Sequence, residues 1–408
     1  MNLALVAMLV AGHTPASAPP DVFKWEGTSH YDLGFQMGAF AAPHIRARLS
    51  QPIYAWLVPW ATSHDGIAIY DDFLRAHVAA YPDYIDEIQG MAEGANVTFA
   101  ELFVINTKLA LTYFAPASLR GQFGGGHGVD QCTDYFLRRD EHGANVTMLA
   151  HNEDADDGDA GHTFIAHVRF RGDEPSWSAF VYAGALPTGG FGWNSNGLAF
   201  TLNYVAPLSG VVRGGIARAF VGRDMLEARD FDDLKRRVVL TDSLVGWSAG
   251  HNHQLLDFSV RPARALGIET GPGHVSASTA LHSRYAHENL YLYLDVAQAK
   301  DPGSEARAAR IAQLPPARDA ADVLAILSDA DNRRFPIYHA AANTRDETGL
   351  RTLATVSFDA EHCVAALWSG AEPGGAPPAH TFRIEGCKGA DGEQAPQVGR
   401  PVSRGTYE

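Results

Sequence analysis

Residues 128–133 read Gly-Val-Asp-Gln-Cys-Thr, and at this point the chain changes from helical to β-strand patterning. A linker, Gly-Gly-Gly-His-Gly at residues 124–128, precedes them, and a strand-turn-strand pattern ending in Ala-His-Asn-Glu-Asp follows, at residues 150–154. Most solitary cysteines are small buried hydrophobic residues. Cys132, however, has polar neighbours and stands where a loop enters a predicted strand. It is therefore a candidate nucleophile, because a cysteine thiolate attacks carbonyl carbon.

The composition limits the possible functions. The chain has 408 residues, 46% of them apolar, which is enough for a large hydrophobic core. A formal net charge of −15 argues against nucleic acid or an anionic membrane as a partner. No stretch reaches the ~18 consecutive apolar residues of a membrane-spanning helix. Three cysteines do not make a disulfide framework, and the sequence leaves open whether Cys363 and Cys387 pair.

The order of predicted elements favours an α+β fold. Residues 31–112 have helical periodicity, and short strands begin at Cys132. Strands that are neighbours in sequence predict antiparallel sheets with helices packed outside them. The predicted strands are 133–139, 146–151, 163–171, 177–183, 198–205, 254–258, 264–269, 352–358, 362–368 and 379–384. The later predicted helices are two within 216–241, broken near Asp230, then 304–313 and 319–329.

The two ends of the chain differ from the rest. Residues 1–18 hold a short apolar run followed by Ala-Ser-Ala, which is typical of a signal peptide, although no Lys or Arg precedes the run. This pattern favours an exported protein, and an ordinary apolar extension is the alternative. Residues 386–408 are polar and rich in Gly and Pro, so a disordered tail is expected there.

Several short motifs occur in a characteristic order. They are Asp-Gln-Cys-Thr at residues 130–133, Asn-Glu-Asp at 152–154, Gly-Trp-Asn-Ser-Asn-Gly at 192–197 followed by Asn203, and His-Glu-Asn-Leu-Tyr-Leu at 287–292. Together they resemble the motifs of the isopenicillin N acyltransferase and carcinine hydrolase-like family of autoproteolytic cysteine N-terminal-nucleophile (Ntn) hydrolases. Flanking segments at 32–38, 84–106 and 329–332 are similar as well, so the resemblance covers roughly residues 25 to 385.

The resemblance implies a four-layer αββα sandwich and self-cleavage between Gln131 and Cys132. Residues 19–131 would form an α chain that ends in the glycine-rich linker. Residues 132–385 would form the catalytic core of a β chain, and the two chains would stay together as a heterodimer.

The resemblance also implies roles for individual residues. Cys132 would be the nucleophile, and its new α-amine, with a pKa of ~8, would be the base. Asp154 would orient that amine. Asn289 would stabilise the oxyanion, and Asn203 would bind the amine or assist Asn289. Two minor candidates for substrate contact are Thr133 and Asn194, although the glycine-rich turn around Asn194 favours a structural role.

Three residues depart from the family pattern. Gln131 replaces glycine, and its Cβ is expected to crowd the attack that cuts the chain. Glu153 replaces tryptophan, and Leu290 replaces histidine. These last two changes bear on substrate contacts more than on the nucleophile.

The predicted activity is hydrolysis of a linear amide, or acyl transfer to another amine, through a Cys132 thioester. The substrate would be a small-molecule amide. No metal or organic cofactor is implied, and an acyl-CoA could serve as co-substrate. The pair His251 and His253 lacks an obvious third metal ligand, and the acidic run at 153–159 lacks calcium-loop spacing. Two alternatives stay open: an amidase for N-acyl lipids or bile-salt-type amides, and a binding protein that never cleaves.

Overall fold

The computed structural model describes residues 21–122, 131–141 and 144–389. The predicted signal peptide, the glycine-rich linker and the tail beyond residue 389 lie outside the described residues. In the described ranges, no helix combines the length and apolar character needed to span a bilayer.

The N-terminal part is helical, as its periodicity predicts. After β1 (Val22–Gly27) come α1 (His30–Leu49), α2 (Pro52–Ala61), α3 (Ile67–Ala80), α4 (Pro82–Ala95), α5 (Phe99–Phe114) and α6 (Ala117–Gln122). Helices α1 and α4 pack backbone to backbone at glycines. A Cβ atom at Gly34 would lie 1.9 Å from the Glu87 carbonyl oxygen, so only glycine fits there.

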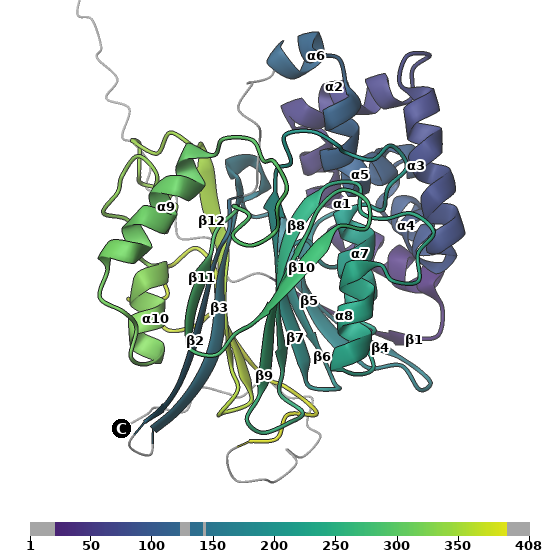
Figure 1. The fold of residues 1–408 in the computed structure, drawn as a ribbon. Helices are drawn as coiled ribbons and strands as arrows, with labels where there is room; N and C mark the ends of the chain where they lie inside the picture. Colours follow the sequence, from purple (N-terminus) through teal and green to yellow (C-terminus); the bar gives the residue numbers. More distant parts are fainter. Residues whose placement is uncertain (1–20, 123–130, 142–143, 390–408) are drawn as a thin grey trace, which may run out of the picture.

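Two sheets form the centre of the fold (Figure 1). One has eight strands in the order β1-β4-β5-β6-β7-β8-β9-β10, and the other has six in the order β11-β2-β3-β12-β13-β14. Neighbouring strands are antiparallel as predicted, except that β1 pairs with β4 in parallel. The strands are β2 (Thr133–Glu141), β3 (Ala144–Asp156), β4 (Thr163–Phe170), β5 (Trp177–Tyr182), β6 (Phe191–Asn194), β7 (Leu198–Val205), β8 (Gly250–Asp257), β9 (Arg264–Thr270), β10 (Ser276–Ala280), β11 (Arg284–His287), β12 (Leu350–Asp359), β13 (Val364–Trp368) and β14 (His380–Arg383).

The sequence patterns did not reveal every strand. Strands β1, β6, β10 and β11 were absent from the prediction, and three of them have only four or five residues. Such short segments are too brief to show a clear alternation of apolar and polar residues.

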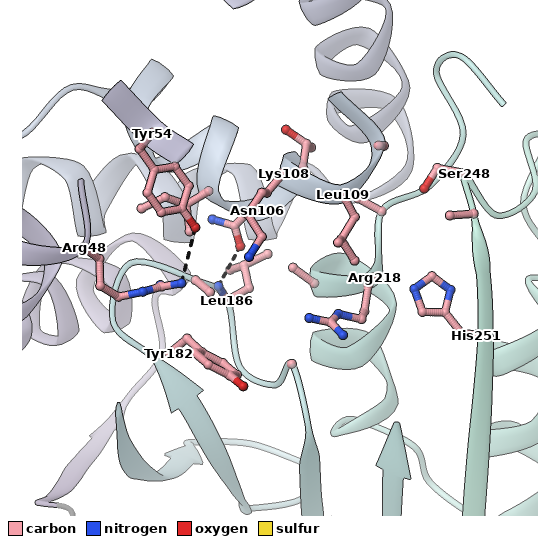
Figure 2. Close-up of a pocket in the computed structure, with 18 of the residues that line it drawn as sticks. Arg48, Tyr54, Asn106, Lys108, Leu109, Tyr182, Leu186, Arg218, Ser248 and His251 are labelled. Atoms are coloured by element: carbon pink, nitrogen blue, oxygen red, sulfur yellow. Dashed lines mark hydrogen bonds between the residues drawn. The ribbon is translucent and has the colours of Figure 1, made fainter. Parts of the chain in front are cut away.

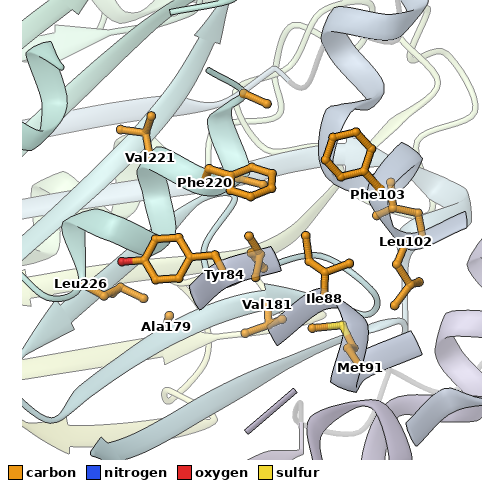
Figure 3. Packing of buried hydrophobic residues seen from close by; sticks show 14 of the residues in the cluster. Tyr84, Ile88, Met91, Leu102, Phe103, Ala179, Val181, Phe220, Val221 and Leu226 are labelled. Carbon is orange, nitrogen blue, oxygen red and sulfur yellow. The ribbon is translucent and has the colours of Figure 1, made fainter. Parts of the chain in front are cut away.

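Three hydrophobic clusters hold the layers together. The largest joins α1–α5 and the later helices α7 (Arg218–Met225) and α8 (Phe231–Val239) to the eight-stranded sheet. Figure 3 shows part of it, with Phe220 of α7 near Tyr84 and Ile88 of α4. A second cluster, including Phe180 and Phe358, fills the space between the sheets. The third packs α10 (Ala320–Leu327) and residues of α9 (Pro302–Gln313) against the six-stranded sheet. The mixed α+β class is confirmed.

The C-terminal boundary of the ordered chain was predicted too early. Residues 386–389 are described, and Cys387 is buried and bonded to Cys363. The expectation of a disordered tail starting at residue 386 was therefore wrong for these four residues, because the disulfide ties them to the sheet-to-sheet cluster.

Removing the disulfide should lower stability. The crosslink spans a sequence separation of 24 residues, for which the loss of unfolded-state entropy is worth about 3 kcal/mol. We expect the double variant Cys363→Ser, Cys387→Ser to lose that amount of unfolding free energy, measured by urea denaturation. An unchanged denaturation midpoint would contradict this prediction.

Candidate active site

Strand pairing places the predicted site residues around Cys132. Strands β2 and β3 are antiparallel, with Thr133 opposite Asn152 and Asp134 opposite His151. Cys132, just ahead of β2, therefore lies beside Glu153. The backbone N–H of Gln131 continues the pairing, because it donates to the Asp154 carbonyl at 3.1 Å. Side chains alternate between the two faces of a sheet, so neighbouring positions serve different networks.

One network faces the eight-stranded sheet and contains the thiol. The Cys132 Sγ lies 3.6 Å from Glu153 Oε2. The same oxygen is 2.9 Å from His151 Nε2, and His151 Nδ1 is 2.8 Å from Asp134 Oδ1. Tyr182 of β5 donates its hydroxyl to Glu153 Oε1 at 2.5 Å. The first four of these residues are fully buried.

The charges in this network perturb one another. Burial raises the pKa of the Cys132 thiol to about 12, and the negative charge of Glu153 adds to the effect. Burial alone would lower the pKa of His151. The carboxylate of Asp134 and hydrogen bonds to its neighbours raise that pKa well above its ordinary value instead. The thiol is therefore protonated at neutral pH, beside an imidazolium held between two carboxylates.

Asp154 points to the opposite face of β3. Its Oδ1 accepts a hydrogen bond from the Thr352 hydroxyl at 2.5 Å, and His339 Nε2 lies 3.8 Å from its Oδ2. Burial raises the pKa of Asp154. Within the described residues, Oδ2 has no hydrogen-bond partner. A buried carboxylate oxygen without a donor is suited to receive a cation that forms nearby.

Arg307 of α9 is a site residue that the sequence did not reveal. It is fully buried, and its Nη1 donates to the Cys132 carbonyl at 2.6 Å and to Thr133 Oγ1 at 2.7 Å. Its Nη2 donates to Asn289 Oδ1 at 2.9 Å and to the Ser304 hydroxyl. The only available sequence signal was an arginine within a predicted helix after the Asn289 motif, which is not specific.

This arginine fixes the orientation of the Asn289 carboxamide. A guanidinium only donates, so Asn289 must present Oδ1 to Arg307 and turn Nδ2 the other way. Nδ2 donates to the Tyr204 carbonyl at 2.8 Å. The structure thus brings Asn289 to the backbone of Cys132 through one shared residue. Thr133 is buried and bonded to the same arginine, which is a positioning contact.

Asn203 of β7 links the two sheets. Its Nδ2 donates to Asp134 Oδ2 at 2.9 Å and to the His287 carbonyl at 3.4 Å. It therefore reaches the site, but it contacts the carboxylate that holds His151.

Asn194 lies elsewhere. It sits near the other end of β7, where its Nδ2 donates to the carbonyls of Leu226 and Ala228. Its Oδ1 accepts from the N–H of Asn196 in the turn. These bonds use the carboxamide in turn formation, which favours the structural role over the suggested substrate contact.

Gln131, the residue ahead of the expected cut, is accommodated. Its Nε2 donates to Asp301 Oδ1 at 3.0 Å. A Cβ atom at Gly303 would lie 2.5 Å from Gln131 Oε1, so the absence of a side chain there leaves room for the glutamine. The side chain that replaces the family's glycine is thus held against α9.

A pocket lies between the N-terminal helices and the eight-stranded sheet (Figure 2). Its charged lining residues are Arg48, Lys108, Asp159 and Arg218, and Arg48 is paired with Asp159 at 2.7 Å. Tyr182 also lines it and connects it to Glu153. Tyr182 is thus the residue that the pocket lining shares with the thiol network, and the lining has three basic side chains and one acidic one.

One group of described residues has the composition of a metal site. Ligand atoms of Cys132, His151 and Glu153 lie within 4.8 Å of one another. However, the 2.9 Å contact between His151 Nε2 and Glu153 Oε2 is a hydrogen bond, so these atoms share a proton where a cation would have to bind. His251 and His253, set aside as metal ligands, pack against Trp247.

Comparison with known proteins shows the family to which the chain belongs. A mixed α/β fold with a buried cysteine at a strand start, supported by Asn and Arg side chains, is an arrangement suited to acyl transfer. The family model for acyl-coenzyme A:6-aminopenicillanic acid acyl-transferase matches residues 141–372, and the chain belongs to this family. The match begins after Cys132, in the β2–β3 hairpin.

One curated relative is the beta-alanyl-dopamine/carcinine hydrolase of Drosophila melanogaster. It is 29% identical over 230 residues, which cover 53% of this chain and 56% of the relative. The match therefore spans about half the length of that protein. The family and this relative together support an amidohydrolase or acyltransferase.

The Cys132 thiol of the full-length chain should react slowly. A pKa of about 12 leaves little thiolate at pH 7, and burial restricts access. We expect alkylation by iodoacetamide to be at least ~100-fold slower than for a free cysteine and to rise about tenfold per pH unit from pH 7 to 9. The measurement is the intact mass of the full-length chain, followed over time. A rate equal to that of free cysteine would contradict the prediction.

Proposed function

We propose that this chain is a self-processing cysteine Ntn amidase that cuts itself between Gln131 and Cys132. The observation that carries the proposal is the position of Cys132 just ahead of β2, with Glu153 against its thiol and with Arg307 bound to both its carbonyl and Asn289. In this proposal the two sheets and their outer helices are the four-layer αββα sandwich of Ntn hydrolases. The chain would work as an α chain ending at Gln131 and a β chain starting at Cys132.

After the cut, one residue would supply both nucleophile and base. The new α-amine of Cys132, with a pKa of ~8, takes the thiol proton directly or through water. The thiolate attacks the substrate carbonyl, the amine product leaves, and water or a second amine resolves the thioester. Asp154 Oδ2, which is buried and lacks a donor among the described residues, is suited to hold the resulting ammonium group.

Asn289 is the proposed oxyanion donor. Its carboxamide is oriented by Arg307, and a preorganised donor costs no reorganisation during the reaction. Loss of such a donor typically costs ~3 kcal/mol of barrier. Asn203 would act through Asp134, as a positioning residue.

Acyl transfer with an acyl-CoA co-substrate is the second enzymatic possibility, because the family model is named for such a reaction. Two other functions are possible for this chain. One is an amidase for N-acyl lipids or bile-salt-type amides, and the other is a binding protein that does not cleave itself. The cleavage experiment below separates the binding protein from the enzymes.

Self-cleavage is the first prediction of this proposal. The purified wild-type protein should give two fragments on a denaturing gel, with Cys132 as the first residue of the second by N-terminal sequencing. Cys132→Ala should stay whole, because no thiol is present to attack the Gln131 carbonyl. A wild-type chain that stays whole through purification and prolonged incubation would contradict the proposal.

The pocket charge predicts a substrate preference. The three test substrates are anilides whose acyl groups are negative (succinyl), neutral (butanoyl) and positive (β-alanyl). We expect kcat/KM to fall in that order by roughly tenfold per step, because one unit of charge is taken to be worth about 1.4 kcal/mol. Arg218→Met should reduce the succinyl preference. The matched control is Arg213→Met, since Arg213 is exposed and paired with Asp72. A β-alanyl anilide that is the best of the three would contradict the prediction.

A further inference from the structure

Self-cleavage needs a base that the mature enzyme does not need. Before the cut, the nitrogen of Cys132 belongs to the peptide bond with Gln131 and cannot accept a proton. The thiol is also buried, and its pKa is raised to about 12, so a free thiolate is scarce. The first attack therefore requires another proton acceptor at Sγ.

Glu153 and His151 both reach the thiol, but the pKa of His151 is held well above its ordinary value, so this histidine is already protonated and Glu153 is the group able to accept a proton. Its Oε2 lies 3.6 Å from Sγ, which is hydrogen-bond range for sulfur. Alternation along β3 puts Glu153 and His151 on the face of Cys132 Sγ and Asp154 on the other. Glu153 therefore serves the thiol, and Asp154 is left for the α-amine that cleavage would create.

The surroundings hold the Glu153 carboxylate in this position. Tyr182 binds Oε1, which leaves Oε2 directed to the sulfur. His151 binds Oε2 and is itself held by Asp134, which Asn203 anchors from the other sheet. A Cβ atom at Gly190 would lie 2.3 Å from Oε2, so the absence of a side chain there makes room for the carboxylate.

We propose that Glu153 is the proton acceptor that activates Cys132 for self-cleavage, with His151, Asp134 and Tyr182 as positioning residues. This inference rests on the self-cleavage proposed above. It gives the glutamate that replaces the family's tryptophan a function in maturation.

The step balances as follows. The thiol proton moves to Glu153 Oε2 as Sγ attacks the Gln131 carbonyl carbon, and the carbonyl oxygen becomes an oxyanion. The intermediate collapses, and the bond between the Gln131 carbon and the Cys132 nitrogen breaks. Glu153 returns the proton to the departing nitrogen, which becomes the free α-amine. Water then hydrolyses the thioester to give the Gln131 carboxylate and the Cys132 thiol.

The test is the rate of self-cleavage, followed by intact mass in protein made by cell-free translation. Glu153→Gln keeps the shape of the side chain but removes its basicity. A positioned general base typically accelerates a reaction by 10²–10⁴-fold. We expect cleavage at least ~100-fold slower than in wild type. Glu174→Gln, at an exposed turn, is the matched control and should cleave at the wild-type rate.

Two further variants separate a chemical role from a structural one. Glu153→Asp keeps a carboxylate but withdraws it from Sγ, and should cleave at an intermediate rate. Glu153→Ala should be slow, and added formate should restore part of the rate by occupying the vacated site. Asp154→Asn tests the competing carboxylate and should not reproduce the loss seen with Glu153→Gln.

The outcomes are distinguishable. If Glu153→Gln, Glu153→Asp and formate-free Glu153→Ala all cleave themselves at the wild-type rate, the inference is overturned. The proposed function would still stand. A wild-type chain that never cleaves would instead overturn the proposed function. If Glu153→Gln does not fold, as judged by thermal melting, Glu153→Asp decides: an undiminished rate overturns the inference.

Discussion

The antiparallel pairing of β2 with β3 is the constraint on which the rest of the site depends. It sets Thr133 opposite Asn152 and therefore places Cys132 beside Glu153. A register shift of one residue would turn every side chain of β3 to the opposite face. The thiol would then face Asp154, and the two carboxylates would exchange their surroundings. Burial of both faces of this hairpin, between the second sheet and α9–α10, makes such a shift costly.

The site is also a balance of buried charges. Arg307 is fully buried and satisfies acceptors on the Cys132 backbone and on Asn289. His151 lies between the carboxylates of Asp134 and Glu153. Removing one partner of a buried ion pair leaves the other charge uncompensated in a medium of low polarity. The loss of folding stability is typically 3–5 kcal/mol. The same interactions that stabilise the fold therefore also hold the nucleophile in place.

Much of this could be predicted from the sequence because the signals are local. Helical periodicity predicted α9 and α10 to within a few residues, and strand alternation predicted β2 and β3. The parallel pairing of β1 with β4 could not be found in this way, because it joins segments more than a hundred residues apart. The hydrogen bonds of Asn194 could not be predicted either, because a motif position does not show which way a carboxamide turns.

The sequence by itself determined the position of Cys132 at a strand start, the order of the motifs and the family to which the chain belongs. Only the tertiary structure decided that Glu153 contacts the thiol, that Arg307 orients Asn289, and that the carboxylates face opposite sides of β3. The physical reason is that local patterns follow from backbone periodicity. Contacts across two packed sheets and a helix depend instead on register and packing, to which the whole chain contributes.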